Sequence, residues 1–200
     1  MAKLRLGHAA LVGGLLAYTT LTQAQIDSFD MSWVDIDRVM AGEVLHRTGK
    51  QGPLIVTIDV AIRIDAPAES IWSVLTACNT APEYVPHVVD CELIETVDDG
   101  TAQLFNQTVK PAFFLPRFEH VFRLDYQPYQ RIDVHRVSGP IAHMEGSWWL
   151  REQGDGIVLL LHSLQLNPGI PIPRFLVRAT LRRDVPRLLA AIRERAEALR

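Results

Sequence analysis

Alternating apolar and polar residues mark segment 54–64 as a strand of a β-sheet. Every second residue of this segment is Leu, Val or Ile, and polar residues such as Asp59 and Arg63 lie between them. Side chains of a strand point alternately to the two faces of its sheet, so this period of two predicts a half-buried strand. Residues 42–46 and the polar run 48–52 predict a partner strand and the turn of a hairpin.

Apolar residues at a spacing of three or four predict two helices. The first follows Pro67, which suits the start of a helix, and carries Ala68, Ile71 and Leu75 on one face. The second closes the chain with a longer apolar stripe, made of Val177, Leu181, Val185, Leu188, Ile192, Ala196 and Leu199. A stripe of this length predicts a long amphipathic helix that packs its apolar face on the rest of the protein.

Six segments with strand character lie between these helices, separated by turn signals rich in Gly, Pro and Asp. They span residues 88–97, 101–109, 117–127, 131–137, 142–151 and 157–166. Short strands joined by tight turns are typical of an antiparallel meander. Together with the hairpin and the helices, they predict an α+β domain in which a curved antiparallel sheet wraps around the long C-terminal helix.

Residues 1–24 read as a cleaved signal peptide. Lys3 and Arg5 form a positive head, residues 9–21 are apolar or small, and Ala24 lies where a signal peptidase accepts small residues. A retained membrane anchor is the alternative, but the apolar run is shorter than the roughly 20 residues that span a bilayer. We therefore expect a periplasmic or secreted protein.

Cleavage after Ala24 would leave an N-terminal extension at 25–41 and a domain at 42–200. Export would place Cys78 and Cys91 in an oxidising compartment, where a pair of cysteines can form a disulfide. The alternative is two buried free cysteines, which pack like small apolar side chains. A disulfide needs Cβ atoms within about 4.5 Å, which a sequence does not show, so both interpretations stay open.

Composition and charge narrow the possible partners. The chain has 48% hydrophobic and 22% charged residues and a formal net charge of −3, so it is a folded chain without the basic surplus of a nucleic-acid binder. The charge is uneven: residues 174–200 hold 8 arginines and 3 acidic residues, whereas residues 25–173 hold 10 basic and 20 acidic residues. The basic end is either a solvated face that balances an acidic body or a surface for anionic membrane lipids.

Several stretches, taken in order, resemble the START-like, or SRPBCC, superfamily. They are IDAPAESIWSVL at 64–75, YVP at 84–86, MEGSW at 144–148, PIPRFL at 171–176 and RRDVPRL at 182–188. The last two resemble the closing helix of exported bacterial members described as polyketide cyclase/dehydrase or coenzyme Q-binding START proteins. The resemblance implies a helix-grip fold with a hydrophobic cavity between the long helix and the concave sheet. The superfamily holds lipid carriers, quinone-binding proteins and cyclases, so the fold leaves the function open.

The residues offer few candidates for catalysis. The sequence holds no Gly-x-Ser-x-Gly, His-Glu-x-x-His, phosphate-binding loop or dinucleotide fingerprint, and its histidines are scattered singly, so we expect no metal and no cofactor. His120 is the exception, because strand alternation places its imidazole on the apolar face with Phe118 and Phe122. It is either a core histidine with a hydrogen-bond partner, or a polar contact for a ligand or a general acid/base.

A ligand cavity is the leading interpretation of the aromatic residues. The expected ligand-binding residues are Phe105, Phe118, His120, Phe122, Trp148 and Phe175. From the resemblance we expect a cavity of roughly 300 to 1,000 Å³, the usual size of a small-molecule site. The alternative is that these rings fill a solid core.

Two apolar segments bounded by prolines, 111–116 and 168–173, stand where polar turn residues would be usual. We expect them to form the portal of the cavity and to touch an anionic membrane. The portal residues would be Phe113, Phe114, Ile170, Ile172, Arg174 and Arg178. The alternative is that both segments pack on each other and cap the core.

These observations favour an exported, non-catalytic binding or carrier protein for a hydrophobic small molecule such as a lipid, quinone or isoprenoid. A cyclase or dehydratase that acts on a polyketide-like substrate in the same cavity is one alternative. A protein-interaction module with a filled core is the other.

Overall fold

The structure is a computed structural model in which residues 29–111, 116–169 and 172–200 are described. The elements are α1 (Ile36–Met40), β1 (Leu45–Gln51), β2 (Ile55–Ile64), α2 (Ala68–Thr76), the 3-10 helix η1 (Cys78–Glu83), β3 (Val88–Val97), the short 3-10 helix η2 (Asp98–Gly100), β4 (Ala102–Val109), β5 (Phe118–Gln127), β6 (Arg131–Ser138), β7 (His143–Gly154), β8 (Ile157–Asn167) and α3 (Arg174–Ala198). Residues Met31–Arg200 form one compact unit, which contains all of these elements.

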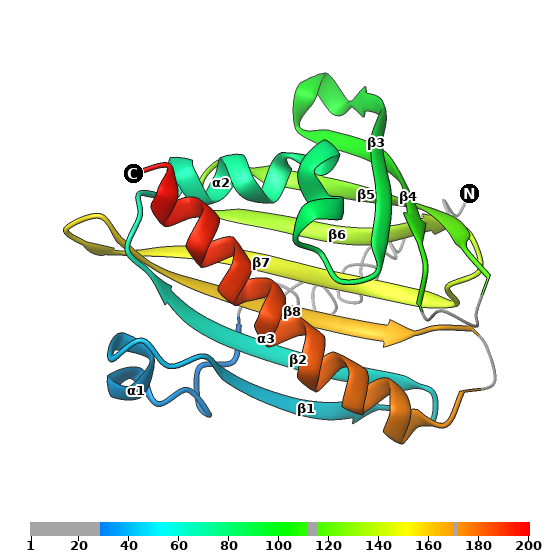
Figure 1. The fold of residues 1–200 in the computed structure, drawn as a ribbon, viewed down its shortest axis with the longest axis horizontal. Coiled ribbons are helices and arrows are strands. Elements are labelled where there is room, and N and C mark those ends of the chain that lie inside the picture. The colour runs from blue at the N-terminus through cyan, green and yellow to red at the C-terminus, as the bar shows by residue number, and fades with distance from the viewer. Residues whose placement is uncertain (1–28, 112–115, 170–171) are drawn as a thin grey trace, which may run out of the picture. The chain divides into compact units, whose positions relative to one another are not determined.

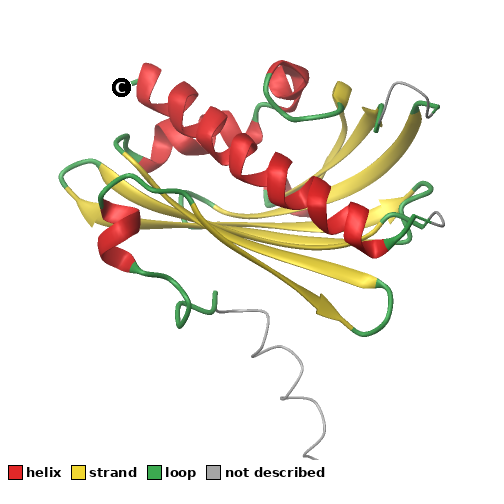
Figure 2. Cartoon of the chain, turned by 60° about the horizontal axis from the view of Figure 1, so that its bottom comes forward, coloured by secondary structure: helices red, strands yellow, loops and turns green. Residues whose placement is uncertain are grey.

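The strands form one antiparallel sheet in the order β1-β2-β8-β7-β6-β5-β4-β3. Figures 1 and 2 show the long helix α3 running across one face of this curved sheet, with α2 on the same face. The predicted α+β fold, a curved antiparallel sheet around a long C-terminal helix, is confirmed. Among the described residues, no helix is long and apolar enough to cross a membrane.

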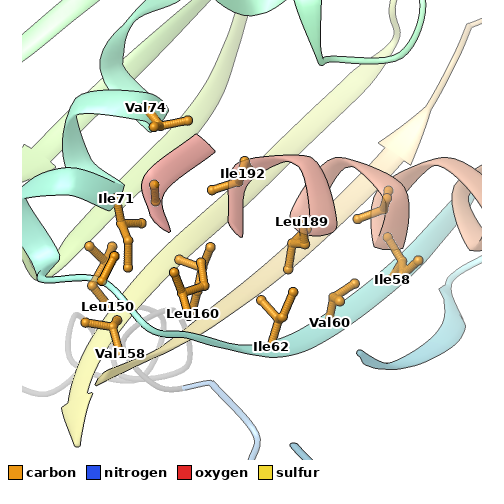
Figure 3. Close-up of a cluster of buried hydrophobic side chains, with 14 of the residues drawn as sticks. Ile58, Val60, Ile62, Ile71, Val74, Leu150, Val158, Leu160, Leu189 and Ile192 are labelled. Carbon is orange, nitrogen blue, oxygen red and sulfur yellow. The ribbon is translucent and has the colours of Figure 1, made fainter. Parts of the chain in front are cut away.

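The main core lies between α3 and the strands β2 and β8. Val60 and Ile62 of β2 and Leu160 of β8 face Leu189 and Ile192 of α3, and all five are fully or almost fully buried (Figure 3). Each such side chain contributes about 1.5 to 3 kcal/mol relative to an exposed position. The apolar stripes read from the sequence therefore supply the two surfaces that hold the helix on the sheet.

The first hairpin differs from the prediction. Strand β1 runs to Gln51 and pairs Thr48 with Ile58 and Gly49 with Thr57, so the run expected to be a turn belongs to the ladder. Gly49 fits here because a Cβ on it would lie only 2.8 Å from the Thr57 hydroxyl oxygen. The turn comes at Gly52, whose φ of 59° favours glycine. The predicted hairpin is confirmed, but residues 48–51, expected in its turn, belong to strand β1, and of the predicted run only Gly52 lies in the turn.

The short helix α1 was not expected from the sequence. The Asp35 side chain caps it by accepting a hydrogen bond from the Arg38 backbone N–H at 3.2 Å. Val39 is fully buried, and the Arg63 guanidinium of β2 donates to the Met40 carbonyl at 2.6 Å. From Met31 on, the expected extension is therefore part of the compact unit. The expected signal peptide, 1–24, lies outside the described residues.

Candidate functional site

A cavity of about 180 Å³ lies between α3, the η1 segment and the concave face of the sheet. The helices contribute Leu75, Ala81, Leu188 and Ile192 to its wall, and the sheet contributes apolar residues of β4 to β8. The cavity is smaller than the expected range of roughly 300 to 1,000 Å³, so that prediction is wrong. The Phe105 and Phe122 rings stack with centroids 5.6 Å apart inside this wall.

Four of the six expected ligand-binding residues line the cavity: Phe105, His120, Phe122 and Trp148. The other two, Phe118 and Phe175, do not. Phe118 shares the face of His120, but it is the first residue of β5 and borders a separate surface hollow.

Phe175 lies on the first turn of α3 with 68% of its surface exposed. Helical geometry explains this position, because Phe175 comes two residues before the buried Val177 and so points away from the sheet. The prediction that Phe175 bounds the cavity is wrong.

His120 is a buried, neutral imidazole in the cavity wall. It is 3% exposed, and its Nε2 lies 3.0 Å from Oε1 of Gln107 on the neighbouring strand. Its Nδ1 is buried and has no hydrogen-bond partner among the described residues. Burial, together with the positive charge of Arg136, lowers the pKa of His120 to about 4. At pH 7 the ring is therefore uncharged and one of its nitrogens is unpaired.

A second buried histidine, His162, lines the same cavity. Its Nδ1 donates to the Ser147 backbone carbonyl at 3.1 Å, and its ring stacks on Trp148 with centroids 3.7 Å apart. Burial lowers the pKa of His162 to about 4, so this ring is also neutral at pH 7. The sequence analysis did not select His162, although the alternation of β8 places it on the inner face with Leu160 and Leu164.

The two cysteines form a disulfide, with Cα atoms 5.4 Å apart. Cys78 begins η1 and Cys91 lies on the edge strand β3, so the bond ties the helical wall of the cavity to the sheet. Both residues line the cavity. Of the two interpretations that the sequence left open, the structure therefore has the disulfide.

Polar contacts fix the η1 wall and the segment after it against the helices. The Tyr84 hydroxyl donates to the Val74 carbonyl of α2 at 2.8 Å, and burial raises the pKa of Tyr84 to about 12. The Arg195 guanidinium of α3 lies over the Tyr84 ring, and His87 Nε2 lies 2.9 Å from the Asp184 carboxylate of α3. These contacts hold one side of the cavity to the long helix.

The described residues of the cavity wall are uncharged. The wall contains no Asp, Glu, Lys or Arg among the described residues, and in that part of the chain no cluster of His, Cys, Asp or Glu could hold a metal ion. With pKa values lowered to about 4, His120 and His162 are weak bases at pH 7 and are not protonated to the imidazolium form. The chemistry that remains is apolar contact with hydrogen bonds from neutral groups.

The expected portal is described only in part. Phe113, Phe114 and Ile170 lie outside the described residues. Ile172 is half-buried and packs against the main core. Arg174 is exposed, and Arg178 is half-buried with an Nε that has no hydrogen-bond partner among the described residues.

Comparison with solved structures gives the same fold with low sequence identity. The aromatase/cyclase ZhuI from Streptomyces sp. R1128 matches with a TM-score of 0.60 and 19% identity, over 79% of this chain and 97% of that chain. A fragment of the STAR-related lipid transfer protein from Xanthomonas axonopodis matches with a TM-score of 0.62 and 20% identity, over 76% of this chain and 98% of that chain. A START superfamily protein from Mycobacterium smegmatis matches with a TM-score of 0.62 and 19% identity, over 72% and 99%.

Sequence comparison identifies the family. A search of the curated proteins finds no match. Residues 64–193, more than half of the chain, match the family described as polyketide cyclase/dehydrase and lipid transport. The matched range runs from the last residue of β2 into α3 and includes every residue of the cavity wall. The chain therefore belongs to the polyketide cyclase/dehydrase and lipid transport family of START-like (SRPBCC) proteins.

Proposed function

We propose that this chain is an exported, non-catalytic carrier of a small hydrophobic molecule such as a lipid, quinone or isoprenoid. The observation that carries the proposal is the cavity itself, which is apolar, partly enclosed and free of charged side chains among the described residues. At about 180 Å³ it is smaller than the usual range of small-molecule sites, so it suits a ring or a single chain better than a two-chain lipid. The family, whose description includes lipid transport, supports the same function.

The test uses a pair of matched variants in β6. Val134 lines the cavity, whereas Val137 lies on the opposite face of the same strand and is exposed. Val134→Phe should fill the cavity and Val137→Phe should not. Organic extraction and mass spectrometry should find a hydrophobic compound in the wild type and Val137→Phe, and none in Val134→Phe. A wild type that yields no compound and binds no apolar dye would instead support an interaction module with a filled core.

A cyclase or dehydratase is the second candidate, because the family description includes these enzymes and two histidines line the cavity. In that case His120→Ala should still bind the ligand, but its turnover rate should fall by a factor of roughly 10² to 10⁴. In a carrier the same variant changes binding only, and neither protein converts the extracted compound.

We also propose that the carrier meets anionic membranes at the N-terminal end of α3. Phe175 and Leu176 are 68% and 47% exposed there, next to Arg174. Exposed apolar residues beside cationic ones suit the interface of an anionic bilayer. The exposed pair Leu93 and Ile94 on β3 is a matched control, because its neighbours Glu92 and Glu95 would repel such a surface.

Sedimentation with anionic liposomes tests this contact. Wild type should bind at low ionic strength and be released by salt, Phe175→Ser/Leu176→Ser and Arg174→Glu/Arg178→Glu should lose binding, and Leu93→Ser/Ile94→Ser should keep it. Absence of binding by the wild type, or equal binding by all four proteins, would exclude the membrane contact.

Export itself is tested by mass spectrometry of the protein expressed from the full sequence. The mature protein should begin near Gln25 and be recovered from an extracytoplasmic fraction. A full-length species embedded in the membrane would exclude the cleaved leader.

A further inference from the structure

The hydrogen bonds of His162 determine which of its nitrogens carries the proton. The Ser147 backbone carbonyl is only an acceptor, so the Nδ1 atom 3.1 Å from it must be the N–H. With its lowered pKa the ring is neutral, and a neutral imidazole carries one proton. The Nε2 of His162 is therefore a lone-pair acceptor, and it has no hydrogen-bond partner among the described residues.

The proton on His120 is assigned through a chain of three residues. Cys91, Gln107 and His120 stand directly opposite one another on the neighbouring strands β3, β4 and β5. In the disulfide, Cys91 has no S–H, so its sulfur can only accept, and Gln107 Nε2 donates to it at 3.9 Å. This orientation of the amide turns Gln107 Oε1, also an acceptor, toward His120.

The consequence for His120 follows from the same logic as for His162. Its Nε2, 3.0 Å from Gln107 Oε1, must carry the proton, which leaves a lone pair on Nδ1. That Nδ1 is buried without a partner among the described residues, and an unpaired buried polar atom destabilises the fold. Both cavity histidines therefore hold a donor bond to the protein and keep an acceptor nitrogen free.

We propose that the cavity selects a ligand with a hydrogen-bond donor, an alcohol or a phenol, on an otherwise apolar body, and that His162 accepts that hydrogen bond through its Nε2. This inference rests on the proposed carrier function and adds the chemical class of the ligand. A ketone or ether of the same shape would bring a lone pair against the lone pair of His162 Nε2. A carboxylate would find no cationic side chain among the described residues of the wall.

Binding of three probes with one carbon skeleton tests the selection. Indane is purely apolar, 1-indanone adds an acceptor, and 1-indanol adds a donor. By titration calorimetry, 1-indanol should bind roughly 3- to 10-fold more tightly than 1-indanone, the worth of one neutral hydrogen bond. His162→Phe, which keeps an aromatic ring, should reduce this ratio.

Gln107→Leu should free the proton of His120 but leave the ratio near its wild-type value, because His120 Nδ1 is enclosed by the protein. Gln103→Leu is the matched control, since Gln103 lies on the same face of β4 but bonds to Tyr126 and Thr96 outside the cavity wall. The ratio should also stay at its wild-type value in this control.

The protonation state also has a readout that needs no ligand. In ¹⁵N spectra of histidine-labelled protein at pH 7, His120 should show a protonated Nε2 and a bare Nδ1, and His162 the reverse, with variants giving the assignment. The opposite protonation on both rings would overturn the proposal. Equal affinity for all three probes would overturn it while leaving the carrier function in place. Absence of binding even by indane would reject the carrier function and this inference together.

Discussion

Removing the Cys78–Cys91 disulfide should destabilise the protein by about 3 kcal/mol. The bond joins residues 13 apart in sequence, and the chain-entropy estimate for a loop of this length is about 3 kcal/mol at 25 °C. Cys91 is buried with Phe105 and Leu124, and both cysteines line the cavity. Cys78→Ala/Cys91→Ala therefore adds a packing loss on the order of 1 kcal/mol to the lost constraint.

Urea unfolding of three samples separates these contributions. Reduced wild type keeps both sulfur atoms and should lose only the constraint, whereas the double alanine variant should lose both contributions and be insensitive to reductant. With m-values of about 1 to 3 kcal/mol/M, the midpoint of the reduced wild type should fall by about 1 to 3 M. A fall of less than about 0.3 M, or a reductant effect of the same size in the double variant, would refute this account.

Three further changes test the cavity. Phe122→Ala should lower the free energy of unfolding, measured with urea, by less than the ~3 to 5 kcal/mol expected for a fully packed phenylalanine, because the ring borders the cavity. A loss of the full ~3 to 5 kcal/mol would indicate a solid core. Burial lowers the pKa of His120 and His162 from 6.5 to about 4, so between these pH values the unfolded chain binds more protons than the folded one. The free energy of unfolding should therefore fall as the pH is lowered from 6.5 to 4, by up to about 3 kcal/mol for each histidine. Unfolding midpoints that stay constant over this range would contradict both shifts. Gly146→Ala should destabilise the protein by about 1 to 3 kcal/mol, because the added Cβ would lie 2.9 Å from a β8 backbone oxygen and 3.7 Å from His162 Cε1. An unchanged unfolding midpoint would show that the two strands move apart without a loss of stability.

Most of the fold could be predicted because hydrophobic periodicity is a local signal. The six segments of the meander and the closing helix each carry enough residues to distinguish a period of two from one of 3.6. The first hairpin was misplaced because the register of β1 depends on pairing with β2, where Gly49 faces Thr57, and no local pattern shows that pairing. The five residues of α1 are too few to show a helical period.

The residues that line the cavity were harder to predict than the fold. Strand alternation gives the face on which a side chain lies, and it placed His120 and Phe122 on the face that lines the cavity. Phe105 and Trp148, expected there from their aromatic rings and the family resemblance, also line it. Alternation does not say where along a strand the cavity ends, so Phe118 was included although it lies beyond the wall. The prediction for Phe175 was wrong for a different reason, because the direction of its side chain depends on how α3 is rotated relative to the sheet.

The hydrogen-bonding character of the wall depends on contacts between strands. A sequence shows that a histidine is present on an apolar face, but its free nitrogen is a donor or an acceptor according to what the other nitrogen touches. For His120 that partner is Gln107, and the amide of Gln107 is oriented by Cys91 on the next strand. Cys91 acts only as an acceptor because it is bonded to Cys78. The same cysteine pair that constrains the wall of the cavity thus also orients the amide that holds the proton on His120 Nε2.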